Sequence, residues 1–180
     1  MYYIKSPRTL SSAQNVLFAF LSCLLSLLVA FGGYSVFAQD TDVVTATVTA
    51  TNLAVSVSDG SIAFGSVALN TATSTAGTGQ TQTVTNDGSA AVLNVKSSNA
   101  TNGTSWTLGT SPGSDIFKLE VSTTTGSTYG TLQATDVYLT ASSTFASLTN
   151  QAVDFRFTTP TASTDFVQKS LTITVQVTTP

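Results

Sequence analysis

Short segments in which apolar and polar residues alternate constrain this chain to a β fold more strongly than any other feature of its sequence. The range Ser61–Lys96 shows the pattern: an apolar segment, a polar loop, a second segment, a tight turn and a third segment. Alternation with period two puts successive side chains on opposite faces of a strand, so each segment can bury one face. We therefore expect three strands in this range.

The residues between these segments indicate how the strands are connected. Gly65 interrupts the first segment after Ile62 and Phe64, and glycine inside a strand pattern is typical of a bulge or a bend. Asn70–Gly79 is a low-complexity polar stretch, which predicts an exposed loop. Asn86–Ser89 contains an Asp-Gly pair, which supplies the φ > 0 residues of tight turns, so we expect a hairpin there.

The rest of the chain repeats this pattern at intervals of about 8–15 residues, without helical periodicity after the N-terminal region. The predicted fold is an all-β, antiparallel, Ig-like β-sandwich of about 8–9 strands. Lys118 and Glu120 are expected to point outward, and Trp106, the only tryptophan, to close one end of the core. The residues expected in the core are Phe64, Leu93, Val95, Phe117, Leu119, Phe155, Phe157, Leu171, Ile173 and Val175.

Parts of this pattern resemble known exported proteins. The string IAFGSV, followed after a loop by TQTVTNDGSAAVLNV, resembles the Ig-like repeats of Hydin-type and bacterial surface proteins, and the motif covers roughly a fifth of the chain. The run Val44–Gly60 resembles the mature start of small exported β-sandwich proteins from bacteria with reduced genomes. In outline, the chain is also similar to the TasA/camelysin biofilm-fibre proteins. These resemblances imply export and an Ig-like fold, and they bring no functional residues to this chain.

The N-terminal region has the three parts of a secretory signal peptide. They are a basic start with Lys5 and Arg8, an apolar run over Val16–Phe31, and small residues before a cleavage site at Val36 and Ala38. We expect cleavage between Ala38 and Gln39, which makes residues 1–38 the signal and residues 39–180 one β-sandwich domain. The apolar run of about 16 residues is shorter than the roughly 20 of a spanning helix but nearly reaches that length when extended, so an uncleaved anchor is the alternative.

The charge of the expected mature domain limits its partners. It contains all nine acidic residues of the chain against four basic ones, which leaves a net charge of −5. Nucleic-acid binding requires a basic surface, so we expect no nucleic-acid partner. The same sign disfavours anionic lipid, so we expect membrane contact only through an uncleaved N-terminal segment. Because Cys23 lies in the signal, the domain must be stabilised without disulfides.

The composition also limits the chemistry of the domain. The chain has no histidine, so Ser-His-Asp and Cys-His catalysis and His/Cys zinc sites are excluded. Asp40 with Asp42, and Asn86 with Asp87, are the pairs nearest to a calcium site, but no stretch has the dense ligand spacing of calcium-binding loops. We therefore expect no enzymatic activity and no cofactor.

The segment that follows the cleavage site has an unusual composition. Val44, Ala46, Val48 and Ala50 alternate with threonines, and no charge occurs over Val43–Thr51. The favoured interpretation is an ordinary first strand of the sandwich. The alternative is a strand-exchange segment, which pairs with the sheet edge of a neighbouring molecule. It lacks the lysine and proline residues that protect natural edge strands from association.

Together these features favour an exported, non-enzymatic structural protein, secreted or located at the cell surface. It would be a fibre or matrix subunit that self-associates through its N-terminal strand. The alternative is an adhesin or ligand-binding Ig-like module that acts through its loops, because loops on a rigid scaffold often carry binding residues.

We predict that the exported protein begins at Gln39, because the small residues at the cleavage site follow a short apolar run. N-terminal sequencing of secreted material tests this prediction. Recovery of the intact N-terminus from membrane fractions alone would instead establish the anchor.

Overall fold

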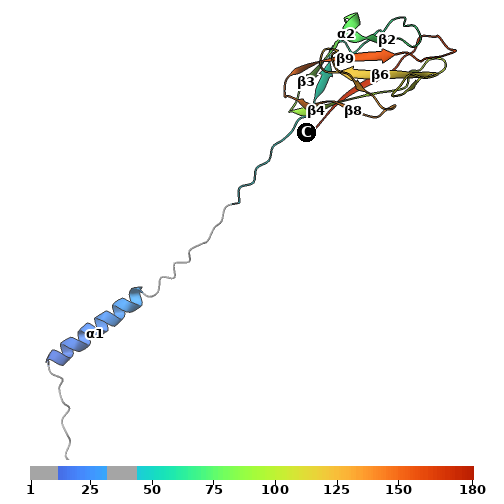
Figure 1. The fold of residues 1–180 in the computed structure, drawn as a ribbon. Coiled ribbons are helices and arrows are strands. Elements are labelled where there is room, and N and C mark those ends of the chain that lie inside the picture. The colour runs from blue at the N-terminus through green and yellow to red at the C-terminus, as the bar shows by residue number, and fades with distance from the viewer. Residues whose placement is uncertain (1–11, 32–43) are drawn as a thin grey trace, which may run out of the picture. The chain divides into compact units, whose positions relative to one another are not determined.

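The alternating segments form two β-sheets in the computed structural model, which describes residues 12–31 and 44–180 (Figure 1). Across the larger sheet the order is β1 (Val55–Val57), β3 (Gln82–Asn86), β9 (Asn150–Thr158), β6 (Ile116–Ser122) and β5 (Thr107–Leu108). In addition, β9 pairs with β2 (Ala72–Ser74), and β6 pairs with β7 (Gly130–Thr131). The smaller sheet contains β10 (Ile173–Thr178), β4 (Ala91–Ser97) and β8 (Leu139–Phe145). The expectation of an all-β fold is confirmed, although β5 and β6 pair in parallel.

The N-terminal part of the chain forms a separate compact unit, residues 1–47, whose described element is the helix α1 (Ser12–Phe31). This helix covers the apolar run of the sequence. No helix within the described ranges is long and apolar enough to cross a membrane. The predicted cleavage site at Ala38 and Gln39 lies outside the described residues, as do Asp40 and Asp42.

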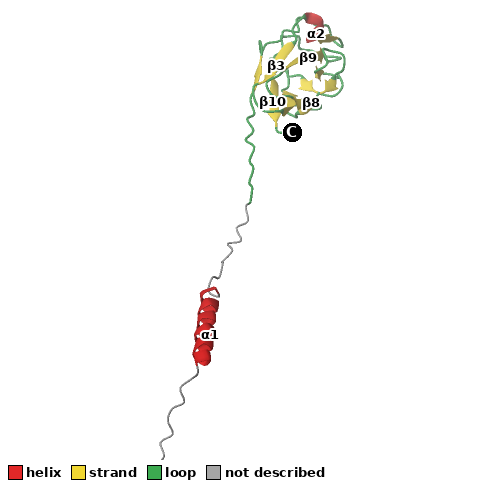
Figure 2. Cartoon of the chain, turned by 90° about the vertical axis from the view of Figure 1, so that its left-hand side faces the viewer, coloured by secondary structure: helices red, strands yellow, loops and turns green. Residues whose placement is uncertain are grey.

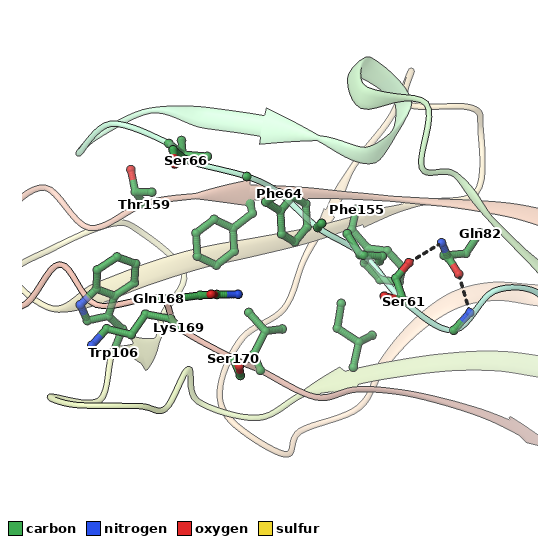
Figure 3. A pocket seen from close by; sticks show the side chains of 18 of the residues that line it. Ser61, Phe64, Ser66, Gln82, Trp106, Phe155, Thr159, Gln168, Lys169 and Ser170 are labelled. Atoms are coloured by element: carbon green, nitrogen blue, oxygen red, sulfur yellow. Dashed lines mark hydrogen bonds between the residues drawn. The ribbon is translucent and has the colours of Figure 1, made fainter.

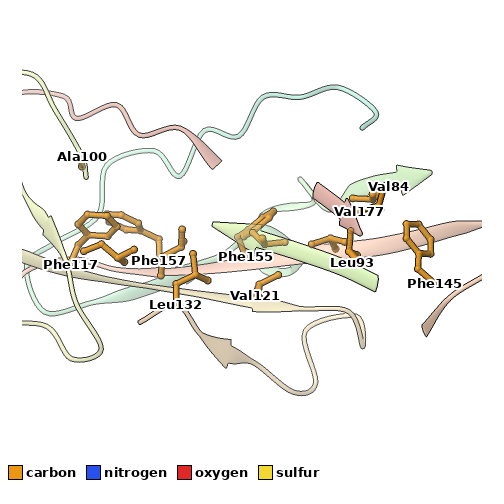
Figure 4. Packing of buried hydrophobic residues seen from close by; sticks show 14 of the residues in the cluster. Val84, Leu93, Ala100, Phe117, Val121, Leu132, Phe145, Phe155, Phe157 and Val177 are labelled. Atoms are coloured by element: carbon orange, nitrogen blue, oxygen red, sulfur yellow. The ribbon is translucent and has the colours of Figure 1, made fainter. Parts of the chain in front are cut away.

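The core lies between the two sheets (Figures 2 and 4). In Figure 2, β3 and β9 lie in one layer of the domain and β8 and β10 in the other. Phe117 and Phe157 stack with ring centroids 5.1 Å apart. Six of the ten residues expected in the core are buried: Leu93, Val95, Phe117, Leu119, Phe155 and Phe157. The other four are only partly buried: Phe64, Leu171, Ile173 and Val175.

The predicted hairpin at Asn86–Ser89 is wrong, because β3 and β4 belong to different sheets. The connection crosses the core from one layer to the other, and the buried Asn86 stabilises it. Its Nδ2 group lies within 3.1 Å of the carbonyl oxygens of Ser89, Phe145 and Ala146, and its Oδ1 accepts from Gly88 N–H. An amide side chain therefore provides the hydrogen bonds that a ladder between the two strands would have supplied.

Two further expectations about loops and strands need correction. The predicted loop Asn70–Gly79 contains β2 and the short helix α2 (Thr75–Thr78), which Ser74 caps at its N-terminus by accepting from Gly77 N–H. Thr75 is fully buried, and its hydroxyl is satisfied because it donates to Asp154 at 2.9 Å. The apolar segment Ile62–Leu69, in contrast, is not a strand.

Phe155 and Thr172 give the contrast that tests this core. Phe155 is 2 % exposed inside the cluster, whereas Thr172 is exposed just before β10. Phe155→Ala should lower the free energy of unfolding by about 3–5 kcal/mol, because it leaves a large cavity. Thr172→Ala should change it by about 0.5 kcal/mol or less. Urea denaturation measures both, and equal losses would contradict this packing.

Candidate functional site

An apolar groove opens along one side of the β-domain, with a volume of about 1180 Å³. One wall is the irregular segment Gly60–Leu69, and the other runs from Phe166 into β10 (Figure 3). Phe64 and Phe155 lie between the two walls, and Trp106 lies toward one end. Phe64 also stacks on Phe157, with ring centroids 5.3 Å apart. The groove is therefore continuous with the buried core and exposes part of it.

Two glutamine side chains position the first wall. Gln80 forms two hydrogen bonds with the backbone of Ala63, both of 2.7 Å. Gln82 accepts from Gly60 N–H and donates to Ser61 O, both at 3.2 Å (Figure 3). These amides satisfy backbone groups that a strand neighbour would otherwise satisfy, so the segment stays in place without joining a sheet. No pattern in the sequence indicated this role, because both glutamines lie where the alternation predicts a loop or a strand.

Gly65 bends the first wall. Its φ is +73°, a left-handed conformation that glycine adopts without strain. The predicted bend at this position is confirmed. It changes the direction of the chain directly after Phe64, within a segment that forms no strand.

A buried lysine positions the second wall. Lys169 Nζ donates to Asn102 O at 2.6 Å and to Thr104 O at 2.7 Å, and it pairs with Asp165 at 2.8 Å. The hydrogen bond from Lys169, together with the N–H groups of Val167 and Thr104, lowers the pKa of Asp165 to about 2. The only cation lining the groove is thus already neutralised, which leaves the groove without free positive charge.

Trp106 closes the end of the groove, as the sequence predicted for one end of the core. It is 9 % exposed, and its indole N–H donates to Ser163 Oγ at 3.1 Å. Beside it, Phe166 and Val167 are 73 % and 48 % exposed at the rim. Large apolar side chains at this exposure favour contact with another apolar surface.

The four half-buried residues of the predicted core all line this groove. Phe64 belongs to one wall, and Leu171, Ile173 and Val175 belong to the other. Their alternation was interpreted correctly, since they do face the core. They stay partly exposed because no described strand lies between the two walls.

The candidate strand-exchange segment lies outside both sheets. Val44, Ala46, Val48 and Ala50 are all exposed, and the two valines are 89 % and 95 % exposed. The interpretation as an ordinary first strand is wrong for these residues, because the first strand is β1 at Val55–Val57.

Asn86, which belongs to one of the pairs nearest to a calcium site, has a structural role, and so do Asn99 and Asn102 in the turn that follows β4. Asn86 is fully buried, and its amide bonds to the backbone of Ser89, Ala146 and Gly88. Asn99 Oδ1 accepts from Leu108 N–H, and Asn102 Nδ2 donates to Gln168 O. Among residues 12–31 and 44–180, no group of three His, Cys, Asp or Glu side chains is placed to hold a metal ion.

Besides the pair of Lys169 and Asp165, a cluster of charges lies on the larger sheet, on the face opposite the core. Arg156 donates to both oxygens of Glu120, at 2.7 and 2.8 Å, and Lys118 pairs with Glu120 at 2.8 Å. The Arg156 guanidinium also lies 4.2 Å from the ring centre of Tyr129. The sequence predicted that Glu120 points outward into solvent. Instead, Glu120 is only 3 % exposed, because these side chains cover it.

Comparisons with protein-family models, curated proteins and solved structures found no match. The groove and the segment Val44–Ala50 both leave apolar groups open to a partner.

Glu120 should make the stability of the domain depend on pH. Burial would raise its pKa, but hydrogen bonds from Arg156 and Lys118 outweigh burial and lower the pKa from 4.5 to about 2. Glu120→Gln should cost about 1.5–3 kcal/mol at pH 7, because it removes charge-assisted hydrogen bonds. The pKa of Glu120 is lower in the folded protein than in the unfolded chain, so the ionised carboxylate stabilises the fold above pH 4.5. This stabilisation, and with it the cost of Glu120→Gln, should shrink as the pH falls from about 4.5 toward 2.

Denaturant unfolding between pH 7 and pH 2 measures this dependence. Asp136→Asn is the matched control, since Asp136 pairs with Lys96 at 3.1 Å while its side chain is 64 % exposed. An exposed pair contributes about 0–1 kcal/mol, so the control should have little effect at any pH. A cost of Glu120→Gln that does not change with pH would contradict the role of the charge.

Proposed function

We propose that the chain is an exported, non-enzymatic structural protein that assembles at the cell surface or in the extracellular matrix, with an Ig-like sandwich as its unit. One observation carries the proposal. An uncharged segment of strictly alternating small residues, Val44–Ala50, is exposed outside the sheets of a domain that has an open apolar side. A segment of this kind offers one apolar face and a row of free backbone groups, which favours strand pairing between molecules.

Export supports the same proposal. The N-terminal region has a basic start, an apolar run and a small-residue cleavage site, which together are typical of a secretory signal. Cleavage after Ala38 would release the domain, and an uncleaved N-terminal region is the alternative; under this proposal the domain functions outside the cytoplasm in both cases. The absence of histidine and of cysteine after residue 38 suits a structural protein that needs no reactive side chain.

An adhesin is the second candidate function, and the rim of the groove favours it. Phe166 and Val167 are exposed in the connection before β10, where they could contact a foreign ligand. A binding module would use this surface as discrete monomers, whereas a structural subunit would use its N-terminal segment to form assemblies. The two functions therefore differ in the state of the purified protein.

We expect the protein secreted from an exporting host to form fibres or large assemblies in electron microscopy and sedimentation. Val44→Asp with Val48→Asp should abolish assembly, because strand pairing would bury two unpaired carboxylates. The fold should be unaffected, since both valines are exposed.

Thr45→Asp with Thr49→Asp is the matched control, because it adds the same charges to the opposite face of the same segment. This variant should still assemble. Wild-type protein that stays monomeric at high concentration would contradict the structural function and favour the adhesin.

A further inference from the structure

The edge of β10 that faces the groove is unpaired by any described strand. Ser98 N–H donates to Thr172 O, so the even-numbered residues of this region bond toward β4. In an antiparallel pair the intervening residues direct their backbone groups the other way. The N–H and C=O groups of Leu171, Ile173 and Val175 therefore face the groove. No described strand pairs with these three residues on that side.

This edge also lacks the protection that natural edge strands carry. From Leu171 to Thr178 the sequence contains no charged residue and no proline. Natural sheets commonly prevent association at an edge with lysine, proline or a covering loop. The edge beside the groove is therefore open to the addition of a strand.

The segment Val44–Ala50 has the properties that this space requires. Its seven residues would extend over roughly 23 Å as a strand, at about 3.3 Å per residue. Its apolar face carries only valine and alanine, which fit beside the half-buried Phe64 and Val175 without a deep pocket. Its other face carries threonines, which suit solvent. The segment has no charge, and the groove offers none, because Lys169 is neutralised by Asp165.

Shortly after the segment Val44–Ala50, hydrogen bonds hold the chain to its own domain. Asn52 O accepts from Ser89 N–H at 2.7 Å, and Ala54 O accepts from Asp87 N–H at 3.0 Å. The backbone crosses Gly88 so closely that a Cβ there would lie 2.2 Å from Asn52 O.

A tight reversal of the chain within the segment Val44–Ala50 would need residues that favour turns. Residues 43–51 contain no Gly, Pro, Asn or Asp, the residues that make such turns. An extended course toward another molecule is the conformation that the sequence favours.

We propose that Val44–Ala50 of one chain binds in the groove of a second chain and pairs with the free edge of β10, which adds a fourth strand to the smaller sheet. This inference rests on the proposed assembly function and names its acceptor site. Repeated from molecule to molecule, the contact is heterologous, so it forms an open fibre or a closed ring.

Trp106 supplies a direct test, since it is the only tryptophan and lies in the groove. The acceptor is the full chain carrying Val44→Asp and Val48→Asp, whose own segment is disabled. A synthetic peptide of residues 41–51 should bind saturably and shift the emission of Trp106. The same peptide with the two aspartates in place of the valines should bind at least roughly tenfold more weakly, since burial of an unpaired charge is strongly unfavourable.

Cysteine cross-linking tests the position of the segment. All chains carry Cys23→Ser, so the introduced thiols are the only ones. A chain with Val48→Cys, mixed with a chain with Val175→Cys under mild oxidation, should yield a disulfide-linked heterodimer. Leu148→Cys is the matched control acceptor, because Leu148 is 77 % exposed but does not line the groove, and it should cross-link poorly.

The outcomes separate this inference from the proposed function. Assemblies that form without a Trp106 shift and without preference for Val175→Cys over Leu148→Cys would overturn the acceptor site and leave the structural function standing. If the wild-type protein is monomeric and its groove does not bind the peptide, both the structural function and the acceptor site are overturned. A saturable Trp106 shift together with selective cross-linking to Val175→Cys would establish the site.

Discussion

The stacked rings of Phe117, Phe157 and Phe64 are the interaction on which the rest of the domain depends. Phe117 on β6 and Phe157 on β9 join two neighbouring strands of the larger sheet, and Phe64 continues the stack into an irregular segment. Aromatic pairs at such distances stabilise a core beyond the area that they bury. Because the last ring belongs to a groove wall, the same contacts that form the core also hold the groove open to solvent at a fixed place.

Polar side chains, rather than strand pairing, hold the walls of that groove. Gln80 and Gln82 form hydrogen bonds with the backbone of one wall. Lys169 attaches the other wall to the loop around Asn102 by donating to its carbonyl oxygen. Buried or half-buried backbone groups must find partners, and each of these side chains supplies them locally. The walls can thus keep their positions while the sheet edge between them stays free, which is the condition that an incoming strand requires.

Much of the fold could be predicted from alternation, since period two by itself says which face of a strand is buried. It placed Leu93, Val95, Phe155 and Phe157 in the core, and it oriented β10 correctly. Alternation does not say which strand is the neighbour. The Asp-Gly pair after β3 therefore predicted a hairpin, although the chain crosses to the other sheet, because the choice depends on the long-range contacts of Asn86 with Phe145 and Ala146.

The sequence by itself determined that this protein is built of alternating β segments, that its reactive side chains are few, and that Val44–Ala50 has the composition of a strand with one small apolar face. Only the tertiary structure decided that this segment lies outside its own sheets and that Leu171, Ile173 and Val175 border an open groove. The reason is that a strand pattern is local, whereas a missing neighbour becomes visible only when strands distant in the sequence are placed side by side.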